Sequence, residues 1–133
     1  MRAIVFAALM IMAGSTDAVA EDRACRVPEA GTWKAHKPAM KSLSRVEIEG
    51  ECRGEDYFLR VRIFTRCAPR DCKWGWSEGV RIGSRVVADF TGLFGTRKVT
   101  LTAMESRMEA MVSSYPHDPT SPEEHYTVIL GRH

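Results

Sequence analysis

Two amino acids are missing from this 133-residue chain, which contains neither asparagine nor glutamine. Any recognition site or catalytic constellation in the protein therefore has to work without side-chain amides. The chain also lacks a strong excess of charge of one sign, because 19 Lys and Arg residues face 17 Asp and Glu residues, a net charge of +2. So weak an excess does not indicate a nucleic acid or another polyanion as partner.

No apolar run in the sequence is long enough to span a bilayer. The longest, from Ala3 to Ala13, follows the positive charge of Arg2 and precedes the small-residue pattern Ala18-Val19-Ala20. This order is typical of a secretory signal peptide, so we predict that residues 1–20 are removed after export and that the mature protein is secreted or periplasmic. The remaining residues, 21–133, suffice for one domain with one modest core.

The mature chain also lacks a clear helical stripe, since its apolar positions alternate with a period of two between Gly, Pro, Ser and Asp breaks. Only residues 104–112 fit a helical spacing as well, and we favour a strand there. The predicted strands are residues 31–35, 43–52, 57–67, 74–82, 84–91, 97–104, 107–113 and 125–130. Eight short strands predict an all-β fold, an antiparallel up-and-down barrel, with a small β-sandwich as the alternative.

A turn at residues 53–56 would fix the register of the second and third strands. One face of this hairpin is then apolar, and the other face sets glutamates opposite arginines. The facing pairs are Val46 with Ile63, Ile48 with Val61, Gly50 with Leu59, Cys52 with Tyr57, Glu47 with Arg62, and Glu49 with Arg60. Each charged pair would contribute roughly 0.2 to 1 kcal/mol where exposed, and we interpret that face as the solvated outside of the barrel.

The four cysteines do not have the spacing of a metal site, because neither a Cys-x2-Cys nor a His-x3-His pattern occurs, and we expect no metal or cofactor. In an oxidising compartment they are expected to form disulfides, for which three pairings exist. The short spacing of Cys67 and Cys72 predicts a tight ring around Pro69. Cys25 would then pair with Cys52 and tie the start of the mature chain to the second strand.

The ring and the residues after it follow the pattern C-x-P-x-D-C-x-W-G, from Cys67 to Gly75. This resembles a family of small bacterial secreted proteins whose typical form is C-x-P-T-D-C-D-W-G. The resemblance extends to Gly31-Thr-Trp33, to residues 44–48 and loosely to Gly131-Arg132, and it implies a lipocalin-like or avidin-like barrel without assigned chemistry. Arg70 stands where threonine is usual, and Lys73 where aspartate is usual.

One segment matches a hydrolase motif, because Gly75-Trp-Ser77-Glu-Gly79 reads G-x-S-x-G. Asp89 or Asp118, followed by His125, would complete a Ser, Asp, His order. A nucleophile elbow requires a strand, a sharp turn and a helix within a parallel sheet, whereas the residues after Gly79 continue as a β-type sequence. We therefore predict that the match is accidental and that the protein is not an enzyme.

Two hypotheses for function remain. The first is a carrier of a small apolar ligand at the barrel mouth, lined by Trp33, Trp74 and Trp76, the last two expected on one face of a strand; packing in the core is the alternative role for these rings. The second is a protein-binding module, such as a periplasmic protease or lysozyme inhibitor, that presents Arg70 on the cystine loop. An open cavity lined by the tryptophans would favour the carrier, and a filled interior with Arg70 protruding would favour the binding module.

Overall fold

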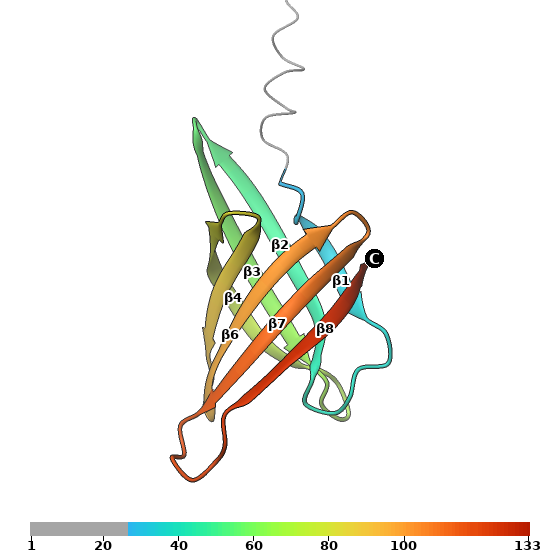
Figure 1. Ribbon diagram of the computed structural model, residues 1–133, viewed down its shortest axis with the longest axis vertical. Coiled ribbons are helices and arrows are strands. Elements are labelled where there is room, and N and C mark those ends of the chain that lie inside the picture. Colours follow the sequence, from blue (N-terminus) through green and yellow to red (C-terminus); the bar gives the residue numbers. More distant parts are fainter. Residues whose placement is uncertain (1–26) are drawn as a thin grey trace, which may run out of the picture.

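The computed structural model describes residues 27–133, which form a closed barrel of antiparallel strands (Figure 1). Each strand pairs with the next along the chain, and the last pairs with the first, so the topology is up-and-down. The eight strands of the described residues are β1 (Gly31–Ala35), β2 (Leu43–Arg53), β3 (Asp56–Thr65), β4 (Cys72–Ile82), β5 (Arg85–Thr91), β6 (Gly95–Met104), β7 (Arg107–Pro116) and β8 (Glu124–Arg132). The predicted barrel is confirmed, and the sandwich alternative is wrong.

Two predictions fall on the part of the chain before residue 27. The predicted signal peptide, residues 1–20, and the predicted disulfide partner Cys25 lie outside the described residues. Within residues 27–133, no helix is long and apolar enough to cross a membrane.

The ambiguous methionine-rich segment is two strands joined by a turn. β6 ends at Met104, and β7 begins at Arg107. Between them Glu105 has a φ of 58°, in the left-handed region that suits a tight turn. The helical alternative for residues 104–112 is therefore wrong. Its apolar side chains instead alternate across β7, with Met108 and Val112 buried and Met111 exposed.

The predicted register of β2 and β3 is confirmed residue by residue. Val46 faces Ile63 and Ile48 faces Val61, with all four side chains buried. On the outer face Arg60 forms an ion pair with Glu49, and the Nε atom of Arg62 donates a 2.8 Å hydrogen bond to Glu47. Period-two alternation and charge pairing thus agree on one arrangement of the hairpin.

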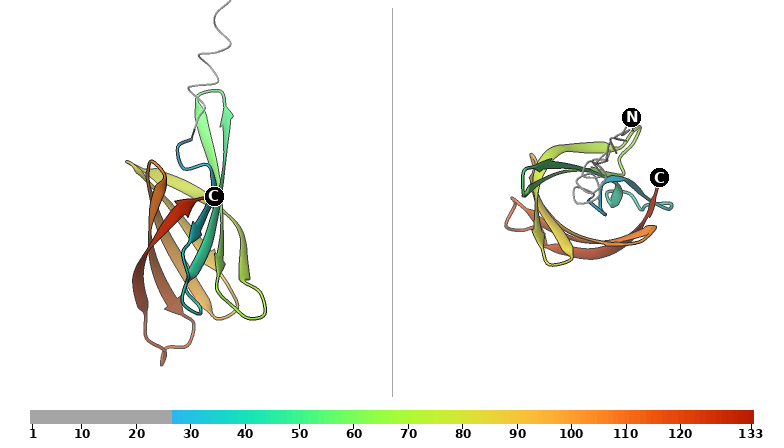
Figure 2. Two further views of the ribbon diagram at one scale, coloured as in Figure 1. Left: turned by 90° about the vertical axis from the view of Figure 1, so that its right-hand side faces the viewer. Right: turned by 90° about the horizontal axis from the view of Figure 1, so that it is seen from above.

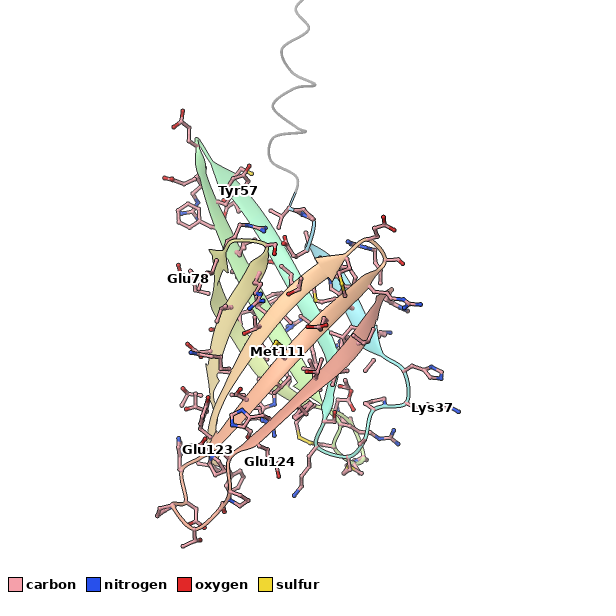
Figure 3. The ribbon with its side chains drawn as sticks, viewed as in Figure 1. Lys37, Tyr57, Glu78, Met111, Glu123 and Glu124 are labelled. Atoms are coloured by element: carbon pink, nitrogen blue, oxygen red, sulfur yellow. A yellow bond between two sulfur atoms is a disulfide. The ribbon has the colours of Figure 1, made fainter. Side chains whose placement is uncertain are left out.

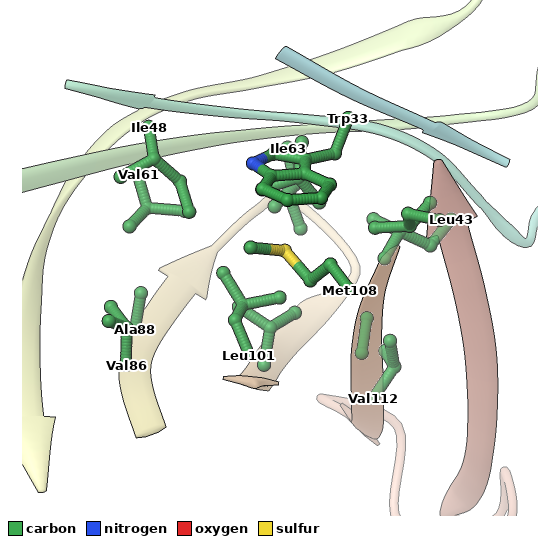
Figure 4. Close-up of a cluster of buried hydrophobic side chains, with 14 of the residues drawn as sticks. Trp33, Leu43, Ile48, Val61, Ile63, Val86, Ala88, Leu101, Met108 and Val112 are labelled. Atoms are coloured by element: carbon green, nitrogen blue, oxygen red, sulfur yellow. The ribbon is translucent and has the colours of Figure 1, made fainter. Parts of the chain in front are cut away.

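Side chains fill the interior of the barrel (Figure 4). Every strand except β4 contributes buried apolar residues, and β4 contributes an inward-facing glycine instead. A Cβ atom on Gly79 would lie 3.0 Å from methyl groups of both Val61 and Val86, so this position keeps space for them. The buried set comprises Trp33, Leu43, Val46, Ile48, Leu59, Val61, Ile63, Val86, Ala88, Phe90, Val99, Leu101, Met108, Ala110, Val112 and Leu130.

Trp33 joins the first and last strands. Its ring is fully buried, and the guanidinium carbon of Arg132 lies 4.1 Å from the ring centroid. Arg132 also donates 2.8 Å hydrogen bonds to the backbone carbonyls of Pro28 and Ala30, while the indole N–H of Trp33 donates to the carbonyl of Glu29. The segment before β1 is thereby held across this end of the barrel.

An ion pair between the buried Glu29 and the exposed Arg81 anchors the same segment. The Glu29 side chain is 3% exposed, and both of its carboxylate oxygens accept hydrogen bonds from Arg81, at 2.8 and 2.6 Å. The hydrogen bond from Arg81 to Glu29 raises the pKa of the guanidinium further above its ordinary value. Val27 completes the cover by packing against Gly50, where a Cβ atom would lie 2.5 Å from a Val27 methyl group.

We expect Val61→Asp to prevent folding, because an unpaired carboxylate in the interior costs an energy comparable with the roughly 5 to 15 kcal/mol that stabilises a whole domain. Exchanging the outer pair, Glu49→Arg with Arg60→Glu, should change the free energy of unfolding by less than about 1 kcal/mol. Circular dichroism and urea titration measure both. A folded Val61→Asp variant beside an unfolded exchange variant would mean that the face assignment is inverted.

We expect Arg81→Met to lower the free energy of unfolding by about 3 kcal/mol, because it leaves the buried carboxylate of Glu29 without a partner. Arg85→Met, at an exposed arginine of the neighbouring strand, is the matched control and should change stability by less than about 0.5 kcal/mol. Equal midpoints in urea for the two variants would contradict a structural role for the Glu29–Arg81 pair.

Candidate functional site

Four connections meet at one end of the barrel, which we call the loop end (Figures 1 and 2). They are residues 36–42, the cystine loop at residues 66–71, the β5–β6 turn at residues 92–94 and the β7–β8 loop at residues 117–123. Backbone hydrogen bonds connect Lys41 with Arg66, and His117 with Phe94. The β2–β3 hairpin, which carries Tyr57, protrudes at the opposite end (Figure 3).

The cystine loop is confirmed, since Cys67 and Cys72 form a disulfide with a Cα–Cα distance of 5.5 Å. Cys52 is also disulfide-bonded, and its predicted partner lies outside the described residues. Three hydrogen bonds hold the loop against β2 and against the connection at residues 36–42. The Ser44 hydroxyl donates a 2.6 Å hydrogen bond to Asp71, the Arg66 guanidinium donates to the carbonyl of Pro38, and the Arg66 N–H donates to the carbonyl of Ser42.

Arg70 lies at the exposed tip of this anchored loop, as predicted. Among residues 27–133, none of the ion pairs involves Arg70. Its guanidinium is therefore presented to solvent from a loop that is closed by a disulfide and tied to β2.

Positive charge is concentrated on and next to two connections at the loop end. Residues 36–42 and 66–73 contain five basic side chains and one acidic side chain, Asp71, although the whole chain carries a net charge of only +2. The hairpin end, residues 49–56, has four acidic side chains and one basic. Across the mouth from the basic loops lie Glu123, the last residue of the β7–β8 loop, and Glu124, the first residue of β8 (Figure 3). We call the exposed set Lys37, Lys41, Arg66, Arg70 and Lys73 the basic surface.

The three tryptophans do not line one cavity, which corrects the expectation from sequence. Trp33 is in the core, and its indole faces the end of the barrel opposite the cystine loop. Trp74 packs against the core at the loop end, where its indole N–H lies 3.2 Å from the Thr65 hydroxyl. Trp76 lies outside the barrel.

Trp74 and Trp76 point to opposite faces because β4 contains a β-bulge between them. The register with β3 shifts between the pair Arg62–Trp76 and the pair Phe64–Lys73. Gly75 has a φ of 74°, a left-handed conformation that glycine adopts without a steric penalty. The extra residue reverses the alternation of the strand, so the predicted shared face is wrong.

Trp76 belongs to a layer of arginines and aromatic rings on the outer face of β2, β3 and β4. Arg60 and Arg62 lie over its ring, at 4.7 and 4.5 Å from the centroid, and each arginine is also ion-paired to a glutamate. A hollow of about 440 Å³ opens beside this layer, next to Phe58. Because these guanidiniums already form ion pairs with carboxylates, we interpret the layer as a structural feature that stiffens the outer surface of the barrel.

A pocket of about 310 Å³ lies at the loop end, in the mouth of the barrel. We call it the mouth pocket. Arg97 crosses it from the inner face of β6, with its guanidinium carbon 4.7 Å from the centroid of Trp74. The lining residues are Trp74, Phe94, Gly95, Arg97, Ser114, Pro116, Asp118 and Ser121. Of this set, sequence analysis named Trp74 as a ligand contact and Asp118 only within the hydrolase-like order; it did not name Arg97, because nothing in the sequence pairs Arg97 with Trp74.

Asp118 orders the loop beside this pocket. Its carboxylate accepts hydrogen bonds from the backbone N–H of Thr120, at 2.9 Å, and from the Thr120 hydroxyl, at 2.8 Å. The backbone hydrogen bond, followed by the hydroxyl, lowers the pKa of Asp118 below its ordinary value. Asp118 is therefore a carboxylate at neutral pH.

The residues of the hydrolase-like motif do not form a Ser, His, Asp triad, because Ser77 contacts the backbone of Asp89 and the His125 ring lies beside Ser113. The Ser77 hydroxyl donates a 2.6 Å hydrogen bond to the backbone carbonyl of Asp89, and β4 continues beyond it to Ile82.

Comparison with protein-family models, with curated protein sequences and with solved structures returns no match for this chain.

A different serine lies beside a histidine, and sequence analysis did not identify it. The Ser113 hydroxyl and Nδ1 of His125 are 2.9 Å apart, and Glu123 lies 3.6 Å from the other ring nitrogen. These groups are neighbours across β7 and β8, and Ser113 also pairs with Lys98 of β6. Backbone amides beside Ser113 are thus used by the sheet rather than grouped to stabilise an oxyanion.

We expect the mature protein to hydrolyse p-nitrophenyl acetate no faster than buffer does, because neither serine has an oxyanion hole beside it. Ser77→Ala and Ser113→Ala should leave this background rate unchanged. A turnover that either substitution abolishes, with circular dichroism unchanged, would identify that serine as a nucleophile.

Proposed function

We propose that this protein is an exported, non-enzymatic binding module whose basic surface contacts the acidic face of a partner protein. The observation that carries the proposal is Arg70, exposed and unpaired by any described carboxylate, on a loop fixed by a disulfide and by bonds to β2.

The filled interior supports a role in binding at the surface rather than inside the barrel. Buried side chains from seven of the described strands occupy the space that a ligand carried within the barrel would need. In a barrel of eight strands, side chains alone can fill the lumen. The carrier hypothesis placed its small ligand at the barrel mouth, and the filled interior restricts such a ligand to that place.

Rigidity and charge support the same surface. A loop that is ordered before binding loses little conformational entropy on association. The basic surface gathers five positive side chains on and next to two connections that are hydrogen-bonded to each other, and such a local field orients the protein as it approaches an acidic partner. Arginine is also among the residue types that most often dominate binding energy.

Two exposed apolar side chains at the same end add a possible contact area. Leu93 and Phe94, in the β5–β6 turn, are 85% and 83% exposed. Aromatic side chains that become buried at an interface contribute strongly to affinity. A cationic loop at the same end as an apolar turn suits the cleft of a secreted glycosidase such as a lysozyme, because such clefts carry a pair of carboxylic groups.

Export is the part of the proposal that rests on the predicted signal peptide. The Cys67–Cys72 disulfide is compatible with a periplasmic or extracellular location, where such bonds persist.

The test compares proteins captured from periplasm and culture medium by the immobilised mature protein and by two charge variants. Arg70→Glu with Lys73→Glu reverses the basic surface, whereas Arg85→Glu with Arg107→Glu reverses the same charge elsewhere. A partner of the proposed kind should be retained by the control and lost by the first variant. For the isolated partner we expect affinity to fall at least about tenfold with the first variant, within about twofold with the control, and to weaken with added salt.

Two results would refute the proposal. One is a partner whose affinity is unchanged by Arg70→Glu with Lys73→Glu. The other is the absence of any protein that distinguishes the two charge variants.

A further inference from the structure

Arg97 differs from the other inward-facing arginines of the barrel. Arg81 is matched by both carboxylate oxygens of Glu29, and Arg132 donates to two backbone carbonyls at 2.8 Å. Arg97 has a single hydrogen bond, of 3.3 Å, to the carbonyl of Lys41. None of the ion pairs among residues 27–133 includes it. A partly buried guanidinium with five N–H donors is thus left with most of them available to a ligand.

The position of Arg97 is nevertheless defined. It stacks on Trp74, which is itself held by packing against the core and by the Thr65 hydroxyl. Gly92 permits this placement, because a Cβ atom there would lie 2.6 Å from the Trp74 ring. A guanidinium fixed on an aromatic face is preorganised to form two parallel hydrogen bonds to a carboxylate.

From these observations we infer that the mouth pocket is a binding site for a small monocarboxylate with a flat apolar body, in which Arg97 binds the carboxylate. Trp74, Phe94 and Pro116 supply apolar walls, and the hydroxyls of Ser114 and Ser121 supply further polar contacts. The volume of about 310 Å³ lies at the lower end of the range for small-molecule sites, which indicates a ligand the size of an aryl acetate.

Asp118 restricts the charge of the ligand. It lines the same pocket, and its lowered pKa keeps it ionised at neutral pH. A second negative charge on a ligand would add to the repulsion from this exposed carboxylate, which lines the same pocket. The site therefore favours a monoanion over a phosphate monoester or a dicarboxylate. This inference does not depend on a protein partner at the basic surface.

The experiment uses the oxidised mature protein and three probes, benzoate, phenylacetate and indole-3-acetate, each paired with its neutral amide. Titrations are followed by the indole N–H signals of Trp74 and Trp33 in ¹H–¹⁵N spectra, assigned with Trp74→Phe. We expect at least one carboxylate to shift the Trp74 signal saturably, to leave Trp33 unmoved, and to bind at least about tenfold more tightly than its amide, because the hydrogen bonds to the guanidinium are charge-assisted.

Two substitutions on β6 separate the role of Arg97 from that of overall charge. Arg97→Met should weaken the best probe at least about tenfold, whereas Lys98→Met, which removes the same charge from the outer face of the same strand, should change affinity by less than about twofold. Arg97→Lys keeps the charge without the planar fork and should lie between them. If Arg97→Met fails to fold, the affinity of Arg97→Lys and the comparison of acid with amide on the wild-type protein decide whether Arg97 binds the carboxylate.

Three outcomes would overturn the site. The first is that no carboxylate shifts the Trp74 signal saturably at concentrations up to about 10 mM. The second is equal affinity for an acid and its amide. The third is unchanged affinity in a folded Arg97 variant. Binding that moves Trp33 instead would place the ligand elsewhere. A phosphorylated control, phenyl phosphate, binding more tightly than benzoate would refute the preference for a monoanion.

Discussion

The barrel depends on the contact between Trp33 and Arg132, because it closes the sheet. β1 and β8 are paired over only three residue pairs, the shortest ladder in the barrel together with that of β4 and β5. Arg132 reinforces this seam by stacking on the buried indole and by holding the backbone at Pro28 and Ala30. A closed sheet has no edge strands to pair with other chains. The two ends of the described chain are thereby fixed together, and every other strand finds both of its neighbours.

Filling the closed sheet with side chains decides where function can reside. The same interior that stabilises the fold by burying Trp33, Leu101, Met108 and their neighbours occupies the lumen (Figure 4). Stability and an internal ligand site would compete for this volume. The barrel meets its environment instead through its outer face and its two ends. Of these, the loop end combines an anchored cationic loop, an exposed apolar turn and a pocket.

At each end of the barrel an arginine stacks on a tryptophan ring, but the two arginines differ in the hydrogen bonds that they form. At one end the arginine that stacks on Trp33 donates two 2.8 Å hydrogen bonds to backbone carbonyls, which makes that contact structural. At the loop end the arginine that stacks on Trp74 has one weak hydrogen bond, and its remaining donors face a pocket. The proposed carboxylate site and the basic surface adjoin there, since Arg97 contacts the carbonyl of Lys41.

Local pattern determined most of the fold and part of the site. Alternation and facing charges predicted the register of β2 and β3, and cysteine spacing predicted the loop that exposes Arg70, because both depend on residues close together in the chain. Only the tertiary structure decided which way Trp74 and Trp76 point, since Gly75 inserts a bulge that alternation cannot reveal. It alone also brought Arg97 to Trp74 and Ser113 to His125. The contact of Arg97 with Trp74 depends on the curvature of the barrel, which brings side chains of β4 and β6 together across β5. The contact of Ser113 with His125 depends on the register of β7 with β8. The alternation of residues within one strand determines neither.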